Sequence, residues 1–377
     1  MKTTNLPSVA LAFCAVVVLS QIPAPVPLAA QSPTPPPTLR QGSGVRAADD
    51  AREAAVLARC RTPPPSPSPA AATGGAPMTA RPVNPSVPRD YTVAAIPGVI
   101  AAGQQWTLLW REGGRLVNTL TFLIADGILA ADDGAVLVAQ AEKSEVTRLT
   151  ANGEVSVVYR DTHTGGALSR NKRGQLFIAR RELYPAVWRL SPGGRLLANR
   201  YQGDPLDCLG AGLNDLSADS RGGVYFTMGG LYYADPHGKV VKYGEDLRAN
   251  GLVLSADEKT LYVTNGAALN AFDVQHDGSL RHQRELVVLP DGAGDGITID
   301  SEGRIYVSGG GAGVRVVAPD GEYLGTIPTP LGVQSVTFGG PDKQTLFALA
   351  SVSYDGHTGA EIISIPMLVQ GYQGRAK

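Results

Sequence analysis

Gly294-Asp295-Gly296-Ile297, followed by Asp-Ser-Glu-Gly-Arg-Ile-Tyr-Val at 300–307, is one copy of a pattern that occurs six times in this chain. In each copy a tripeptide begins a short apolar strand, and a second apolar strand follows after a turn. Asp or Asn stands first in four of the copies. The tripeptides are Asp126-Gly127-Ile128, Gly166-Ala167-Leu168, Asn214-Asp215-Leu216, Asn250-Gly251-Leu252, Asp295-Gly296-Ile297 and Gln334-Ser335-Val336.

The repeat has a period near 40 residues. The second strands begin near Val136, Leu176, Val224, Leu261, Ile305 and Leu346, at intervals of 40, 48, 37, 44 and 41. A ladder of turns runs in phase with them, and its X-Gly pairs suit turns that need a positive φ. These turns are Asn152-Gly153, Gly193-Gly194, His237-Gly238, Asp277-Gly278 and Asp320-Gly321. Four short strands in each unit of this length predict an all-β fold, a six-bladed β-propeller.

The last repeat is one strand short. It supplies strands near Val336, Leu346 and Ile362 and then reaches Gln370-Gly371 without a fourth. Residues 105–110, before the first repeat, alternate polar and apolar side chains. We therefore predict that an N-terminal strand at 105–110 pairs with the strand near 361–366 and closes the last blade.

The chain divides by composition into three parts. Residues 1–30 indicate a signal peptide, with Lys2, an apolar core that is too short to span a bilayer, and Ala29-Ala30 as a cleavage site. Residues 31–91 contain a stretch of helix formers at 48–61 and a linker rich in Pro, Ala and Ser. Residues 92–370 form the propeller. The expected location is therefore periplasmic or secreted, without a membrane span.

Net charge and cysteine content indicate which kinds of partner and chemistry the sequence does not support. The formal net charge is -1 and no basic run occurs, which gives no support for a nucleic-acid partner. Cys60 and Cys208 remain after signal removal, and either a disulfide or two free thiols is compatible with the sequence. No CxxC motif or Cys/His cluster is present, which disfavours zinc and cysteine redox chemistry. The sequence does not indicate an oligomeric state.

Equivalent positions of the repeats should meet at one end of the central channel. Asp126, Asn214, Asn250 and Asp295, the axial donors, would then converge on one point. Two carboxylates and two amides suit a hard divalent cation, and calcium is the expected ion. Asp295 is the expected catalytic residue, since a carboxylate beside a cation can accept a proton from water. Asn-Gly and Asp-Gly are also common turn pairs, which is the competing interpretation.

The last residue of each second strand returns to the same end of the channel. These residues are Gln140, Arg180, Met228, Asn265, Gly309 and Ala350. Three of them carry polar side chains. We therefore predict that Gln140, Arg180 and Asn265 contact a substrate.

The residues around the donors resemble the gluconolactonase/senescence-marker-protein (regucalcin-like) family over residues 95–368. The motifs are Asn214-Asp215-Leu216 before Gly-Gly-Val-Tyr-Phe-Thr, Ala249-Asn250-Gly251-Leu252 before Ser-Ala-Asp-Glu-Lys-Thr-Leu-Tyr-Val-Thr, Gly294-Asp295-Gly296-Ile297, and Val336-Thr-Phe-Gly-Gly-Pro-Asp-Lys. The resemblance implies a six-bladed propeller with one catalytic divalent metal ion, often calcium, that hydrolyses sugar lactones. It also implies metal-site roles for Asn214, Asn250 and Asp295, with Asp295 as general base. Asp126 stands where that family usually has glutamate.

Three functions remain open at this point. The first is an exported metal-dependent hydrolase with a small sugar lactone as its substrate. The second is a non-catalytic propeller that binds a ligand or a protein at the same face, and the third is a related metal-dependent phosphoesterase. A covalent serine hydrolase is disfavoured, because no Gly-x-Ser-x-Gly motif occurs.

Overall fold

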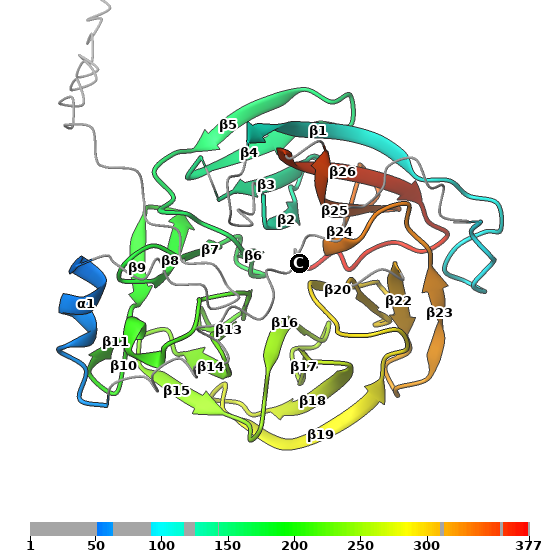
Figure 1. Cartoon of the computed structure of the whole chain (residues 1–377). Helices are drawn as coiled ribbons and strands as arrows, with labels where there is room; N and C mark the ends of the chain where they lie inside the picture. Colours follow the sequence, from blue (N-terminus) through cyan, green and yellow to red (C-terminus); the bar gives the residue numbers. More distant parts are fainter. Residues whose placement is uncertain are drawn as a thin grey trace, which may run out of the picture. The chain divides into compact units, whose positions relative to one another are not determined.

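The computed structural model describes residues 51–62, 92–116, 125–141, 143–309, 313–354 and 357–375. Six four-stranded antiparallel sheets are arranged around a central axis (Figure 1). The predicted six-bladed β-propeller is therefore confirmed. The predicted signal peptide at 1–30 and most of the 31–91 linker lie outside the described residues.

Blades 1 to 5 are meanders whose strands follow one another in the sequence, whereas blade 6 takes one strand from the N-terminal side of the propeller. Blades 1 and 2 contain β2 (Gly127–Ala130), β3 (Val136–Gln140), β4 (Glu145–Leu149), β5 (Val155–Tyr159), β6 (Leu168–Arg170), β7 (Leu176–Arg180), β8 (Ala186–Ser191) and β9 (Arg195–Ala198). Blades 3 and 4 contain β12 (Leu216–Ala218), β13 (Val224–Thr227), β14 (Leu231–Ala234), β15 (Val240–Tyr243), β16 (Ala249–Leu254), β17 (Thr260–Asn265), β18 (Ala268–Val274) and β19 (Leu280–Val288).

Blade 5 contains β20 (Ile297–Ile299), β21 (Ile305–Val307), β22 (Val314–Val317) and β23 (Tyr323–Ile327). Blade 6 contains β24 (Val333–Gly339), β25 (Thr345–Tyr354), β26 (His357–Pro366) and β1 (Thr107–Leu116). Between blades 2 and 3 lie a short hairpin and a 3₁₀ helix. These are β10 (Arg200–Tyr201), β11 (Asp204–Pro205) and η1 (Leu206–Leu209).

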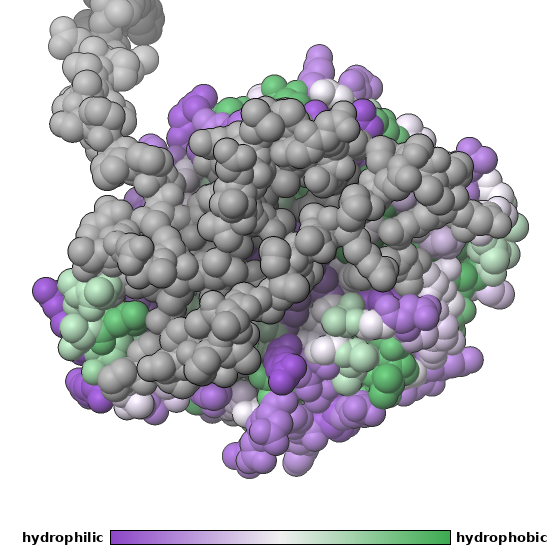
Figure 2. All heavy atoms as spheres, in the orientation of Figure 1, coloured by the Kyte–Doolittle hydropathy of each residue, from purple (hydrophilic) through white to green (hydrophobic). Residues whose placement is uncertain are grey.

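Burial follows the position of a strand within its blade. The inner strands β2 and β3 are buried at every residue, whereas the outer strand β5 is largely exposed. β19 is exposed along most of its length and gives a hydrophilic border to the molecule in Figure 2. The X-Gly turns have the expected positive φ, for example 87° at Gly278 and 99° at Gly321. The buried inner strands thus face the axis, and the exposed outer strands face away from it.

The N-terminal strand closes the last blade as predicted. β1 pairs antiparallel with β26, with Thr107 opposite Ser364 and Leu108 opposite Ile363. The sheet order β1-β26-β25-β24 therefore joins the two ends of the propeller in one blade. This pairing covers a sheet edge that would otherwise be free.

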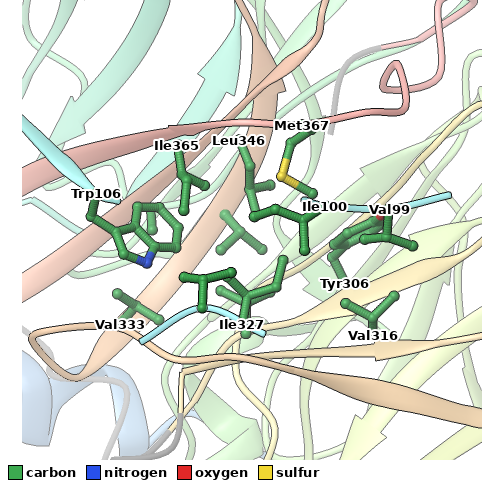
Figure 3. Packing of buried hydrophobic residues seen from close by; sticks show 14 of the residues in the cluster. Val99, Ile100, Trp106, Tyr306, Val316, Ile327, Val333, Leu346, Ile365 and Met367 are labelled. Atoms are coloured by element: carbon green, nitrogen blue, oxygen red, sulfur yellow. The ribbon is translucent and has the colours of Figure 1, made fainter. Parts of the chain in front are cut away.

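The segment before β1 packs between blades 5 and 6. Val99, Ile100 and Trp106 belong to the same buried cluster as Tyr306 of β21 and Leu346 of β25 (Figure 3). The Trp106 indole Nε1 also donates a hydrogen bond of 2.8 Å to the Pro328 carbonyl. The N-terminal segment is therefore part of the core as well as of the sheet.

The chain after β26 crosses the side of the ring where the inner strands end. The Ser301 amide donates to the Gln370 carbonyl over 2.8 Å, and the Tyr372 hydroxyl donates to the Ala256 carbonyl over 3.0 Å. Arg375 is 5% exposed and donates to the backbone at the end of β16. The C-terminal segment thereby connects blades 6, 5 and 4 on the side opposite the tripeptides.

A short helix is attached to the propeller by a disulfide. α1 (Ala51–Leu57) lies within the predicted helical stretch, and Cys60 is bonded to Cys208 of η1. The backbone amide of Arg61 donates to Asp204 over 3.1 Å. The pairing that the sequence left open is thus a disulfide. Among the described residues, no helix has the length and apolarity needed to cross a membrane.

We expect Trp106→Ala to lower the free energy of unfolding by about 3–5 kcal/mol, because it removes a buried indole and leaves a cavity between blades 5 and 6. Leu108→Ala is the matched control, since Leu108 is 46% exposed whereas Trp106 is 9% exposed. Denaturant unfolding followed by circular dichroism measures both losses. Equal losses in the two variants would contradict the role assigned to the N-terminal segment.

Candidate functional site

A small cavity lies where the six inner strands begin. Its volume is about 30 Å³, which is room for a water molecule or two or for one metal ion. Each of the six tripeptides contributes at least one residue to its lining. All four axial donors, Asp126, Asn214, Asn250 and Asp295, line this cavity. The structure therefore brings together residues that are widely spaced in the sequence.

Glycines in the tripeptides permit this close approach. A Cβ added to Gly251 would lie 2.0 Å from the Asp295 carbonyl oxygen, and one added to Gly296 would lie 2.7 Å from the Gln334 carbonyl oxygen. Gly251 lies inside β16 and has no positive φ. The Asn-Gly pair at 250–251 therefore serves packing around the axis rather than a turn.

Two buried threonines fix the backbone of the donors. The Thr227 hydroxyl accepts from the Asp215 amide over 3.0 Å and donates to the Asn250 carbonyl over 2.6 Å. Thr264 occupies the equivalent position one blade later and accepts from the Gly251 amide over 2.7 Å. Each hydroxyl thus holds the start of an inner strand in place.

The donor side chains form a connected network. The Asn214 Nδ2 donates to the Asn250 Oδ1 over 2.5 Å, and Asn250 donates to the Asp295 carboxylate. Asp215 lies beside them, but its two oxygens accept from the Leu216 and Leu252 amides over 2.8 and 3.0 Å. Asp215 therefore acts as a structural link between blades 3 and 4.

Arg181 also contacts the axial donors, although its position in the repeat does not predict this. Its side chain is 3% exposed and forms an ion pair with Asp126. Its Nη2 also donates to the Asn214 carbonyl oxygen over 2.5 Å. The sequence signal that could have found it is Gly165-Gly166, which leaves the second tripeptide without a side chain at the first position.

The pKa of the Asp295 carboxyl group departs from its ordinary value. Burial, together with the negative charges of Asp126 and Asp215, raises the pKa of Asp295 to about 7. Arg181 and the hydrogen bond from Asn250 oppose this rise. A carboxyl group with this pKa can exchange a proton near neutral pH.

The axial donors fit a divalent cation by their chemistry. Their side chains offer carboxylate and amide oxygens, which are the ligands that hard cations prefer. Within the described ranges no group of three or more His, Cys, Asp and Glu side chains could hold a metal ion. A cation site here would therefore depend on the amides of Asn214 and Asn250 as well as on the two carboxylates.

The three predicted substrate contacts lie at the ends of the second strands. Gln140 is buried, and its Nε2 donates to Thr147 over 3.0 Å. The Asn265 Oδ1 accepts from the Arg248 amide over 2.8 Å. The Arg180 guanidinium stacks on Trp188 at 3.7 Å, and burial lowers its pKa to about 10. None of the three lines the axial cavity.

Known proteins resemble this chain in sequence and in fold. Residues 124–351 match the family described as the SMP-30/Gluconolactonase/LRE-like region. A lactonase drp35 from Staphylococcus epidermidis is 30% identical over 195 residues, which cover 44% of this chain and 56% of the relative. A gluconolactonase from Zymomonas mobilis is 33% identical over 175 residues, covering 37% and 48%. The chain thus spans about half the length of these curated relatives.

The similarity in fold extends over a larger part of the chain than the similarity in sequence. A solved gluconolactonase structure from Xanthomonas campestris superposes with a TM-score of 0.59 at 24% identity, and covers 74% of this chain and 97% of that one. At this level of identity the likeness concerns the fold alone.

We expect the contribution of Asp295 to the stability of the cation-free protein to fall as the pH rises from about 4 to 7. A carboxyl group whose pKa is raised in the fold stabilises the folded state below its unfolded pKa, and this stabilisation is lost as the pH passes the folded value. Asp295→Asn should remove the effect, which amounts to a few kcal/mol because one pKa unit corresponds to about 1.4 kcal/mol.

Urea unfolding in the presence of chelator at several pH values measures this difference. The quantity compared is the difference in unfolding free energy between the parent and Asp295→Asn at each pH. The other carboxyl groups are present in both proteins, so their contributions cancel in this difference. A constant difference between parent and Asp295→Asn across pH 4–8 would show that Asp295 has an ordinary pKa.

Proposed function

Because the chain belongs to the SMP-30/gluconolactonase/LRE-like family, we propose that it is an exported metal-dependent hydrolase that opens a sugar lactone. The observation that carries the proposal is the convergence of Asp126, Asn214, Asn250 and Asp295 on one axial cavity. Relatives named lactonase and gluconolactonase support the choice of substrate class.

Asp295 is the group that we assign as general base. With its pKa raised to about 7, it is a stronger base than an ordinary aspartate at neutral pH. It takes a proton from a water molecule whose oxygen adds to the lactone carbonyl carbon. The bond from this carbon to the ring oxygen then breaks, the ring oxygen receives the proton, and an open-chain hydroxy acid is released.

The other axial donors orient the Asp295 carboxylate and, together with it, would hold a divalent cation. Asn250 donates to the Asp295 carboxylate and is itself oriented by Asn214, so the carboxylate has a fixed direction. A divalent cation held by the four axial donors, with calcium as the proposed ion, would supply positive charge for the carbonyl oxygen as it becomes an oxyanion. Thr227 and Thr264 hold the strand starts that carry these side chains.

The alternative function is a non-catalytic propeller that binds a ligand at the same face, above the axial cavity. The observation that favours it is the ion pair between Arg181 and Asp126, which neutralises one axial donor from within the chain. A binding protein of this kind would hold a lactone or another small polar molecule without opening it.

Export is the second part of the proposal. Its support is the predicted signal peptide together with the disulfide between Cys60 and Cys208, since disulfides persist in oxidising compartments such as the periplasm. The bond attaches the segment at 51–62 to η1, between blades 2 and 3.

We expect the purified protein to hydrolyse at least one member of a panel of aldonolactones, and we expect chelator to abolish the activity. Asp295→Ala should lower kcat by ~10²- to 10⁴-fold, because that is the range for loss of general base catalysis. Asp342→Ala, an exposed aspartate between β24 and β25, is the matched control and should keep the parent rate. Parental turnover in Asp295→Ala, or no lactone opened by the parent, would favour the binding protein.

We expect protein isolated from its native host to begin near residue 31, because Ala29-Ala30 is the predicted cleavage site. Mass spectrometry of the intact chain measures the terminus. Non-reducing peptide maps of the same sample should link the peptides that contain Cys60 and Cys208. An intact Met1 on protein from the cytoplasmic fraction would contradict export.

A further inference from the structure

Arg181 places a positive charge from the protein itself beside two of the axial donors. The Arg181 guanidinium forms an ion pair with Asp126, and its Nη2 lies 2.5 Å from the carbonyl oxygen and 3.4 Å from the Oδ1 of Asn214. One buried cationic group thus contacts two of the four side chains that would hold a divalent ion.

Blade 2 supplies the space for this group. A Cβ added to Gly166 would lie 2.1 Å from the Arg181 Cζ and 2.4 Å from its Nε. Gly166 has no positive φ, so its backbone conformation does not require glycine. The guanidinium therefore fills the volume in which blades 1, 3, 4 and 5 place the side chain of an axial donor.

The Arg181 guanidinium is held in place by charge, because its hydrogen-bonding groups are not all paired. The Arg181 Nε is buried and has no hydrogen-bond partner. Leaving a buried donor unpaired is costly, and the ion pair with Asp126 offsets that cost. The opposite charge of Asp126 is thus the main attraction that holds the guanidinium beside the axial donors.

We propose that Arg181 is a resident cation that competes with a divalent metal ion for Asp126 and Asn214. A metal ion can take these two ligands only when the guanidinium leaves them, so the competition weakens metal binding. The inference rests on the proposed function only for the identity of the metal ligands. It assigns to this chain a built-in competitor that sets the cation concentration at which the site is filled.

Two variants displace the competitor in different ways. Arg181→Met removes the charge and keeps an apolar stem of similar length. Gly166→Ala keeps every charge but places a methyl group where the guanidinium lies, and the long arginine side chain can move aside. Arg180→Met is the matched control, because it removes the same charge from the adjacent residue, whose guanidinium stacks on Trp188 instead.

The test is calorimetric titration of each chelator-treated full-length protein with calcium. We expect Arg181→Met and Gly166→Ala to bind calcium at least 10-fold more tightly than the parent. Arg180→Met should stay within about threefold, since it leaves the donors untouched. If Arg181→Met is unfolded without metal, recovery of the parental circular dichroism spectrum on addition of calcium supports the same competition.

The outcomes separate this inference from the proposed function. Equal or weaker calcium binding in both variants, with measurable binding in the parent, would overturn the competition and leave the metal site in place. No calcium binding in the parent or in any variant would overturn both the competition and the metal site of the proposed hydrolase.

Discussion

The site depends on the close packing of six strand starts around one axis. Each tripeptide must let the backbone of the next approach, and Gly251 and Gly296 allow this because a side chain at either position would overlap a neighbouring carbonyl oxygen. The same packing forces like charges together. Asp126 and Asp215 lie close enough to Asp295 to raise its pKa, and Arg181 and the hydrogen bond from Asn250 oppose this rise.

The fold was predictable from the sequence because its signals are periodic. A period near 40 residues, X-Gly turns in phase with it and a missing last strand were enough to predict six blades and the pairing of β1 with β26. The packing of Val99 and Ile100 between blades 5 and 6 was not predicted, because a short irregular apolar segment has no period from which its partners can be inferred.

The site was predictable only where its residues share a repeat position. The axial donors do so, and all four line one cavity. Arg181 does not, since it lies one residue beyond the end of β7 (Leu176–Arg180). Neighbouring residues in an extended chain point to opposite sides. Arg180 therefore stacks on Trp188, while the next residue, Arg181, contacts the axial donors. The prediction that placed Arg180 near the site was thus one residue away from the arginine that lies there.

The blade shared by β1 and β26 limits how this protein can change in size during evolution. A repeat added after Pro366 would find the free edge of β26 already taken by β1, and one added before Thr107 would meet the same obstacle. Gain or loss of a blade therefore requires duplication or deletion inside the chain, between two complete sheets. It also requires every remaining tripeptide to adopt a new angle around the axis, so that a change in blade number would redesign the cavity at the same time.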